Sequence, residues 1–202
     1  PIFPNNYMIK IVSKPRWLLR KLGLGGKMGE LRHDLTDDHE EFFFADSFGE
    51  EFDAFFKRVA PQYYLTVVKD CAFMNWRYTN QPYIEYHILY RKKHDKIVSV
   101  QVLKGYWHIG KIVDIIWDNN LSDEPYTSLK YACDLFNRAG FTNVYTWGTL
   151  KRFRDSLTRC GFMNLKESPL FCVTTRYPNI DELADGDNLH FVDGDGDYEF
   201  LE

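Results

Sequence analysis

The spacing of hydrophobic residues changes along this chain between the period typical of helices and the period typical of strands. The first helical stripe has four apolar residues at i, i+3, i+4 and i+7: Phe52, Phe55, Phe56 and Val59. This stripe predicts a helix over residues 47–60 with one buried face. Ser47 and Glu50 are spaced as a capping box at its start, and Pro61 ends it.

A short aromatic helix and three strand-like stretches follow. Asp70 is placed to cap that helix, and Pro82 ends it. The stretches cover residues 83–92, 97–102 and 110–118. The third is the most apolar, as expected of a central strand buried on both faces. Only short polar turns separate the three, so we predict an antiparallel meander.

After the meander, helices and strands alternate. Residues 122–139 form a predicted helix that ends at Gly140, and residues 143–147 form the next strand. A helix between two strands predicts a right-handed β-α-β crossover, which makes residues 143–147 parallel to residues 110–118.

The pattern closes with one more helix and strand. Thr149 is placed to cap the helix, and Gly161 with Phe162 predicts a Schellman ending. Residues 165–175 form the last predicted strand, with Pro169 at a bulge or an edge. Near the other end of the chain, residues 9–12 form a short predicted strand.

Composition narrows the class of protein. The 202 residues are 45% hydrophobic and 27% charged, which fits one folded domain with or without an extension and argues against global disorder. No apolar run approaches a membrane-spanning length, and no secretory leader is visible. The four cysteines lack a C-x-x-C pair, so we expect reduced thiols and a cytoplasmic protein, with one disulfide pair as the open alternative. No basic stripe crosses the centre of the chain, so we expect no nucleic-acid partner.

The charge is unevenly distributed. Residues 1–33 carry seven Lys or Arg against one acid, and residues 181–202 carry nine acids and no Lys or Arg. The basic apolar run over residues 15–26 has two interpretations: an anchor at a membrane surface, or a linker helix that packs on a neighbouring domain. We favour the linker because the apolar run is short. The predicted division is therefore residues 1–33 as a basic linker or the tail of an upstream domain, and residues 34–202 as one domain.

Two acidic stretches resemble metal sites. Residues 33–41 hold two histidines and five acids, but they lack regular spacing on one face, so we expect a solvated loop. Asp193, Asp195 and Asp197 alternate with glycines as at the start of a calcium loop. Tyr198 stands where such a loop needs glycine, so we expect a turn and no metal.

The order of elements carries a resemblance. A meander, a crossover helix, a parallel strand and a helix that ends in Gly161-Phe162 resemble the GCN5-related N-acetyltransferase (GNAT) superfamily over about residues 45–200. The expected fold class is mixed α/β (α+β), with a GNAT-like central mixed sheet and flanking helices. The motif Asn75-Trp-Arg-Tyr78 resembles a bacterial subgroup in which two such domains are often joined, and some of whose members belong to polysaccharide biosynthesis loci.

The resemblance implies an acyl donor, acetyl-CoA or another acyl-CoA, at the point where two parallel central strands splay apart. In the superfamily, backbone amides of a glycine loop at the start of the crossover helix bind pyrophosphate. The matching residues 118–126 contain no glycine and carry Asp118, Asp123 and Glu124. Leu157 stands where many members have a tyrosine that protonates the leaving thiolate, and Leu150 where many have asparagine.

The predicted catalytic residues are Asp114 and Tyr145. Asp114 lies in the central strand, where a lone acid is costly to bury unless it is paired. It is either a general base for an attacking amine or the ion-pair partner of Arg77. Tyr145 on the parallel strand either faces the acceptor or belongs to the core.

The predicted ligand-binding residues form two groups, one of backbone amides and one of side chains. Backbone amides of Ile115, Ile116 or Trp117 would bind the thioester oxygen. The predicted substrate-binding side chains are Trp76, Arg77 and Trp147. For each the alternative is structural: a core position for the two tryptophans, and an internal ion pair for the arginine.

These features lead to two hypotheses of function. The first is an acyltransferase that moves an acyl group from acyl-CoA to an amine or aminosugar. The second is a degenerate, non-catalytic GNAT-like module that binds a partner domain or a glycan.

Overall fold

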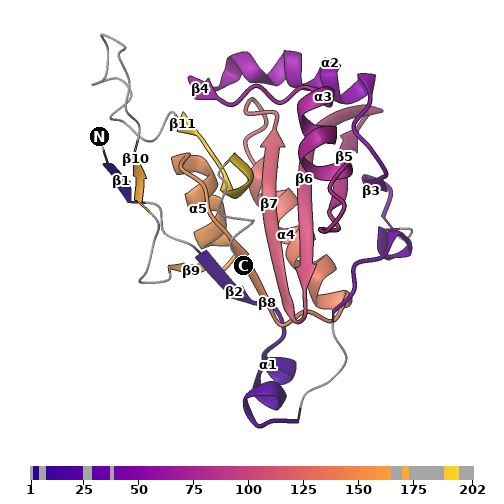
Figure 1. The fold of residues 1–202 in the computed structure, drawn as a ribbon. Helices are drawn as coiled ribbons and strands as arrows, with labels where there is room; N and C mark the ends of the chain where they lie inside the picture. The colour runs from indigo at the N-terminus through magenta and orange to yellow at the C-terminus, as the bar shows by residue number, and fades with distance from the viewer. Residues whose placement is uncertain are drawn as a thin grey trace.

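The computed structural model describes residues 2–4, 8–24, 29–36, 39–164, 170–172 and 189–195 (Figure 1). Its centre is a seven-stranded mixed sheet in the order β3-β5-β6-β7-β8-β2-β9. In sequence order, its strands are β2 (Met8–Ile11), β3 (Phe42–Ala45), β5 (His87–Lys93), β6 (Lys96–Tyr106), β7 (Ile109–Trp117), β8 (Asn143–Thr146) and β9 (Met163–Asn164).

The antiparallel meander β5-β6-β7 is confirmed. His94 and Asp95 make the first turn with positive φ angles of 48° and 60°, as a tight hairpin requires. The predicted start of the first strand at Tyr83 is wrong, since β5 begins at His87. From Gly110 on, every residue of β7 is buried, which explains its dense apolar sequence.

The crossover is also confirmed. Helix α4 (Glu124–Arg138) connects β7 to β8, and the two strands pair in parallel. Gly140 follows α4 with φ +96°, a conformation that favours glycine. In Figure 1, α4 lies behind β6 and β7, with α5 (Lys151–Arg159) beside it.

The helices start at caps that differ in part from those predicted. Asp70 caps α3 (Cys71–Met74), because its Oδ1 accepts a hydrogen bond from the Phe73 amide at 2.8 Å. The predicted capping box at Ser47 is wrong: α2 (Glu50–Val59) starts after Gly49, with no side-chain cap. Its four-residue apolar stripe is buried as expected. The predicted cap at Thr149 is also wrong, since its hydroxyl donates to the Leu189 carbonyl and α5 starts after Leu150.

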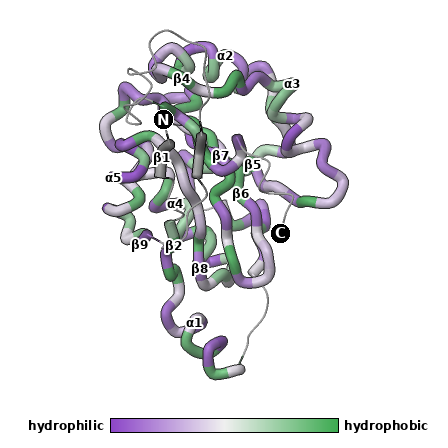
Figure 2. The backbone as a smooth tube through the Cα atoms, turned by 60° about the vertical axis from the view of Figure 1, so that its left-hand side comes forward, coloured by the Kyte–Doolittle hydropathy of each residue, from purple (hydrophilic) through white to green (hydrophobic). Residues whose placement is uncertain are grey.

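Three strands of the sheet fall outside the predicted meander and crossover: β2, β3 and β9. The edge strand β3 pairs with β5, although its sequence lies beside the acidic loop and was not predicted as a strand. Strand β2 pairs with β8 on one side and β9 on the other, so part of residues 1–33 belongs to the sheet and is not a linker. Helix α1 (Lys14–Lys21) projects from the body below β2 and β8 (Figure 1 and Figure 2).

The described C-terminal residues return to the centre of the molecule. Strand β11 (Leu189–His190) pairs in parallel with β4 (Leu65–Thr66), and the turn η5 (Asp193–Asp195) contacts β7. Of the predicted strand at residues 165–175, Leu170–Cys172 form β10, which pairs with β1 (Ile2–Pro4). Pro169 lies outside the described residues. No described helix has the length and apolar character to cross a bilayer.

Candidate functional site

Strands β7 and β8 diverge near the centre of the sheet. Their pairing runs from Ile109 opposite Asn143 to Lys111 opposite Tyr145. The last link is a side-chain bond, in which the Thr146 hydroxyl donates to the Ile112 carbonyl at 2.9 Å. Beyond it, the β8-facing edge of β7 has no strand partner among the described residues. This is the divergence that the sequence analysis predicted for the site.

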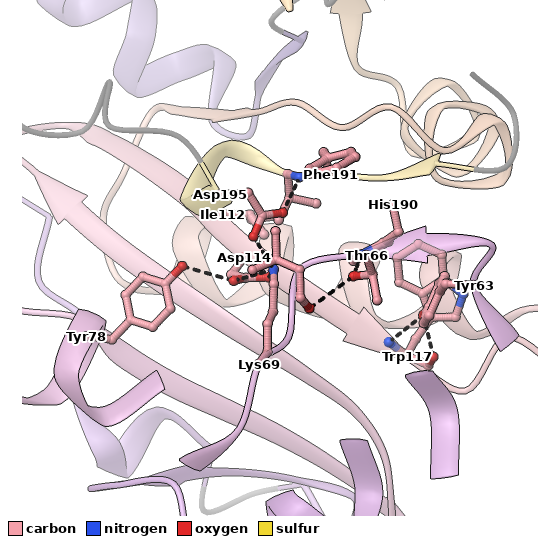
Figure 3. A network of polar contacts seen from close by, with 12 residues as sticks. Tyr63, Thr66, Lys69, Tyr78, Ile112, Asp114, Trp117, His190, Phe191 and Asp195 are labelled. Atoms are coloured by element: carbon pink, nitrogen blue, oxygen red, sulfur yellow. Dashed lines mark hydrogen bonds and ion pairs between the residues drawn. The ribbon is translucent and has the colours of Figure 1, made fainter. Parts of the chain in front are cut away.

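The segment Leu189–Asp195 contacts both β7 and the residues that follow β8, and Figure 3 shows it beside β7. Val192 forms a β-bridge with Gly148, and the Thr149 amide donates to the Phe191 carbonyl at 2.9 Å. The turn η5 lies against β7 at Asp114. The edge of β7 is therefore covered by the chain itself.

Four ionisable side chains meet beneath this segment (Figure 3). Lys69 Nζ lies 2.7 Å and 2.8 Å from the two carboxylate oxygens of Asp114, and 2.8 Å from Asp195 Oδ1. The Tyr78 hydroxyl donates to Asp114 Oδ2 at 2.9 Å. The side chains of Lys69, Asp114 and Asp195 are 0%, 2% and 2% exposed. We call these four residues the Lys69 network.

Burial and mutual charge shift the pKa values in the Lys69 network in identifiable directions. Burial alone would lower the pKa of Lys69, but Asp114 and Asp195 raise it above its ordinary value, so the amine is charged. Burial raises the pKa of Asp195, and the charge of Asp114 raises it further, against the effect of Lys69. Burial and the two carboxylates raise the pKa of Tyr78, which remains a proton donor.

Such a network is expensive to build for stability alone. Removing charges from water costs several kcal/mol per ion, and a buried ion pair often contributes no more stability than apolar residues of the same volume. Clusters of buried, mutually perturbed ionisable groups concentrate at functional sites. Because its members come from three distant parts of the chain, the Lys69 network is the strongest candidate site in the described structure.

A second ion pair lies on the same turn. Asp193 Oδ2 is 2.7 Å from Lys111 Nζ, and Asp193 Oδ1 accepts a hydrogen bond from Trp147 Nε1 at 2.5 Å. Two aspartates of one turn therefore reach two lysines beneath the sheet edge. The turn expected from the sequence is confirmed at Asp193–Asp195, and Asp197 lies outside the described residues. Among the described residues, no group of three or more His, Cys, Asp or Glu side chains is arranged to hold a metal ion.

The predicted oxyanion donors are all buried. The Trp117 amide donates to the Tyr63 hydroxyl at 3.2 Å, and the same hydroxyl donates to the Trp117 carbonyl at 2.6 Å. The Asp118 amide donates to Val98 on β6, so Ile116, two residues earlier, also points its amide toward β6. The amides of Ile115 and Trp117 point to the opposite side, toward the divergence.

His190 contacts the same stretch of β7. Its ring centroid lies 4.5 Å from that of Tyr63 and 5.1 Å from that of Trp117, and Thr66 Oγ1 is 3.3 Å from its Nδ1. Burial lowers the pKa of His190 to about 3, and the charge of Lys69 adds to this effect. A neutral imidazole therefore covers the Ile115–Trp117 backbone.

The remaining predicted residues are dispersed. Trp76 is 60% exposed, so the alternative of a core position is wrong, while Trp147 is buried. Arg77 is buried with its guanidinium 6.0 Å from the Tyr78 ring. The ion-pair partner of Asp114 is Lys69, so the alternative in which Asp114 pairs with Arg77 is wrong. Tyr145 is half-buried between Lys111 and Ile9 of the neighbouring strands.

A cavity of about 390 Å³ lies beside the Lys69 network on the other side of Tyr78. Tyr78 and Tyr86 form part of its wall, and Asp46 and Glu85 place carboxylates at it. Tyr78 is therefore the residue that the cavity and the Lys69 network have in common. The acidic lining favours a cationic group such as an amine.

The start of α4 does not fit the pyrophosphate of CoA. Glu124 lies buried in the first turn and forms an ion pair with Arg91, and its Oε1 accepts a hydrogen bond from Ser128. Asp118 pairs with Arg58, and Asp123 with Arg159 at 2.9 Å. Carboxylates with their own partners occupy the position where a phosphate would need backbone amides.

Sequence reasoning missed Lys69, Tyr78 and Asp195 as site residues. The signal available was Asp114 itself, since a buried strand acid requires a partner. Nothing in the local pattern identified that partner, because Lys69 lies 45 positions away from Asp114.

No protein-family model and no curated protein matches the sequence. Two solved structures of Saccharomyces cerevisiae N-myristoyltransferase with bound myristoyl-CoA, one also with inhibitors, align with a TM-score of 0.51 at 12% identity. They cover 80% of this chain, which spans 46% and 45% of theirs. L-PGS from Bacillus licheniformis aligns with a TM-score of 0.40 at 12% identity, covering 72% of this chain and 45% of that one.

At this identity the likeness concerns the fold alone. The seven-stranded mixed sheet, the crossover and the likeness to the N-myristoyltransferase structures define a GNAT-like fold, as the sequence predicted. The narrower resemblance to a bacterial two-domain subgroup stays a prediction.

Proposed function

We propose that this chain is an acyltransferase whose chemistry takes place at the Lys69 network. The observation that carries the proposal is the convergence of Lys69, Asp114, Tyr78 and Asp195 where β7 and β8 diverge. The N-myristoyltransferase structures, which contain an acyl thioester, support the same class of reaction for this fold.

The proposed acceptor is an amine or aminosugar in the cavity beside Tyr78, where Asp46 and Glu85 attract its positive charge. Once the cationic amine has lost one proton, its nitrogen bonds to the acyl carbon of a thioester. The carbon–sulfur bond then breaks, and the thiolate leaves and takes up the second proton that the nitrogen releases. Asp114 takes the amine proton through the Tyr78 hydroxyl, and Lys69 stabilises the carboxylate.

The Ile115 amide is the proposed donor to the thioester oxygen. Trp117 is a weaker candidate because its amide already donates to the Tyr63 hydroxyl, and Ile116 is weaker because its amide faces β6. The proposed acyl donor is still an acyl-CoA, but only its thioester has a proposed binding site. Its pyrophosphate has none, because the start of α4 does not fit that group. The proposed substrate contacts are Tyr145 on β8, Trp147 directly after β8, and Trp76 with Arg77, which precede Tyr78 in sequence.

A second candidate function is a non-catalytic module. Its support is the segment Leu189–Asp195, which covers the edge of β7 where a thioester would bind. In the catalytic proposal, this segment must shift to admit the donor.

The test compares two donors and two variants. Acetyl-CoA and a short acetyl thioester without the nucleotide are offered with glucosamine, and thiol release is followed. We expect the two donors to react at similar rates, since no pyrophosphate site assists the longer one. Asp114→Asn should lower kcat by about 100-fold or more. Tyr78→Phe should also lower kcat, and this variant leaves no buried charge without a partner. Asp155→Asn, which changes an exposed carboxylate, is the matched control and should leave kcat unchanged.

Binding is checked separately by thermal unfolding. A donor at a hundred times its Kd adds about 2.7 kcal/mol of stability. If no donor raises the melting temperature and no thiol is released, the non-catalytic module is the better description. Thiol release that persists in Asp114→Asn and Tyr78→Phe would remove the Lys69 network from the mechanism.

A further inference from the structure

Helix α1 and the residues after it expose an apolar stripe that the described structure leaves uncovered. The helix has no buried residue. Its leucines and the two that follow are between 46% and 65% exposed: Leu18, Leu19, Leu22 and Leu24. Exposed leucines gathered on one short element mark an interaction surface, whereas single exposed leucines are common.

Cations flank the leucine stripe of α1 on both sides. Leu18, Leu19 and Leu22 lie at i, i+1 and i+4 and share one face of the helix. Because an α-helix turns by 100° per residue, the cations fall on both sides of that face. One side has Lys14 and Lys21, and the other has Arg16 and Arg20. No acid occurs from Ser13 to Leu24.

More cations lie where α1 meets the body. A cavity of about 390 Å³ lies between α1 and the end of α4. Four arginines line it, with one carboxylate, that of Glu30: Arg16, Arg20, Arg32 and Arg138. Arg16 Nη1 donates to the Asn137 carbonyl at 2.6 Å, which attaches α1 to the last turn of α4. Leu19 and Leu24 also line the cavity, so its wall is both apolar and cationic.

We propose that α1 docks this chain on an anionic lipid surface. The exposed leucines enter the headgroup region, the flanking lysines stay at the level of the phosphates, and the arginines of the cavity bind a lipid phosphate. Charge complementarity favours a lipid surface, because the cations that flank the stripe and line the cavity, with Glu30 as the one carboxylate among the lining residues, complement the negative surface of an anionic bilayer. The proposal is independent of the acyltransferase proposal.

The test is flotation of the full chain with vesicles. Phosphatidylcholine vesicles that contain phosphatidylglycerol should bind it, and binding should fall as salt rises. Leu18→Ser with Leu22→Ser should lower the bound fraction by about tenfold or more. Lys14→Gln and Lys21→Gln should each lower the partition about fivefold, the equivalent of one surface charge.

Matched controls remove similar groups elsewhere. Val68→Ser with Met163→Ser removes two exposed apolar side chains, and Lys57→Gln removes one exposed cation. Both should bind vesicles as the parent chain does, and circular dichroism confirms that each variant is folded.

Three results would overturn the proposal. The first is no binding to anionic vesicles, and the second is equal binding to pure phosphatidylcholine. The third is concentration-dependent self-association that Leu18→Ser with Leu22→Ser abolishes in the absence of vesicle binding, which would assign the stripe to a second copy of the chain.

Discussion

Lys69 is the residue on which the candidate site depends. It is the one described cation that contacts both Asp114 and Asp195, and its side chain is fully buried. The sequence shows why Asp114 needs a partner but not which residue supplies it. Lys69 is followed by Asp70, which caps α3 and faces solvent, so adjacent charged residues have opposite environments. That difference arises from the path of the backbone and has no counterpart in local periodicity.

Replacing Lys69 by methionine keeps the length of the side chain and removes its charge. Asp114 and Asp195 would then lie buried together without a cation, so we expect Lys69→Met to lower the free energy of unfolding by about 3–5 kcal/mol. Urea denaturation measures this change. Lys151→Met is the control, because Lys151 and Asp155 form an exposed pair that contributes less than about 1 kcal/mol. Equal losses in both variants would mean that the buried carboxylates do not need Lys69.

The sequence predicted which helices and strands form more accurately than it predicted where they begin and end. The stripe of α2, the density of β7 and the glycine after α4 predicted elements that the structure confirms. The predicted caps at Ser47 and Thr149 were wrong. The Thr149 hydroxyl bonds a carbonyl of β11, an element distant in the sequence. A capping pattern indicates what a side chain can bond locally, and a tertiary contact can take its place.

The turn η5 is the element that closes the candidate site, and Gly194 allows it to approach. A Cβ at Gly194 would lie 2.0 Å from the Tyr78 hydroxyl and 3.2 Å from the Val113 carbonyl. Gly194→Ala should therefore push η5 away from β7 and lower the free energy of unfolding by about 1–3 kcal/mol. Urea denaturation measures the loss, and hydrogen exchange at the amides of β7 should become faster.

Gly49→Ser provides the comparison, since nothing lies within 4 Å of a Cβ at Gly49 and serine suits its position before α2. This control should be neutral or slightly stabilising. Unchanged stability and exchange in Gly194→Ala would show that η5 is not held against β7.

At the scale of the whole molecule, the sheet brings together parts of the chain that are distant in sequence. Strand β2 lies between β8 and β9, and η5 joins β7 from near the other end of the described chain. The predicted division at residue 33 treated the N-terminal segment as an extension because it is basic and glycine-rich. Pairing of β2 on both sides makes it an interior strand, a property of the sheet that composition does not reveal.

A proline in β2 tests this role. Ile9 lies opposite Tyr145 on β8 and Met163 on β9, so Ile9→Pro removes a backbone donor from a strand that is paired on both sides. We expect a loss of about 4 kcal/mol or more in the free energy of unfolding, measured by urea denaturation. Ile9→Val keeps the β-branched shape and should cost about 1 kcal/mol. If Ile9→Pro left the free energy of unfolding unchanged, β2 would not be a paired strand of the sheet.

The sequence by itself determined the GNAT-like order of elements, because hydrophobic periodicity, turn residues and the crossover rule act over short distances along the chain. It also identified Asp114, since burying an acid in an apolar strand is costly wherever that strand lies. Only the tertiary structure decided that Lys69, Tyr78 and Asp195 surround Asp114, that β2 enters the sheet, and that Leu189–Asp195 cover the divergence of β7 and β8. These contacts join residues far apart in sequence, and their pairing is set by how the elements pack in space.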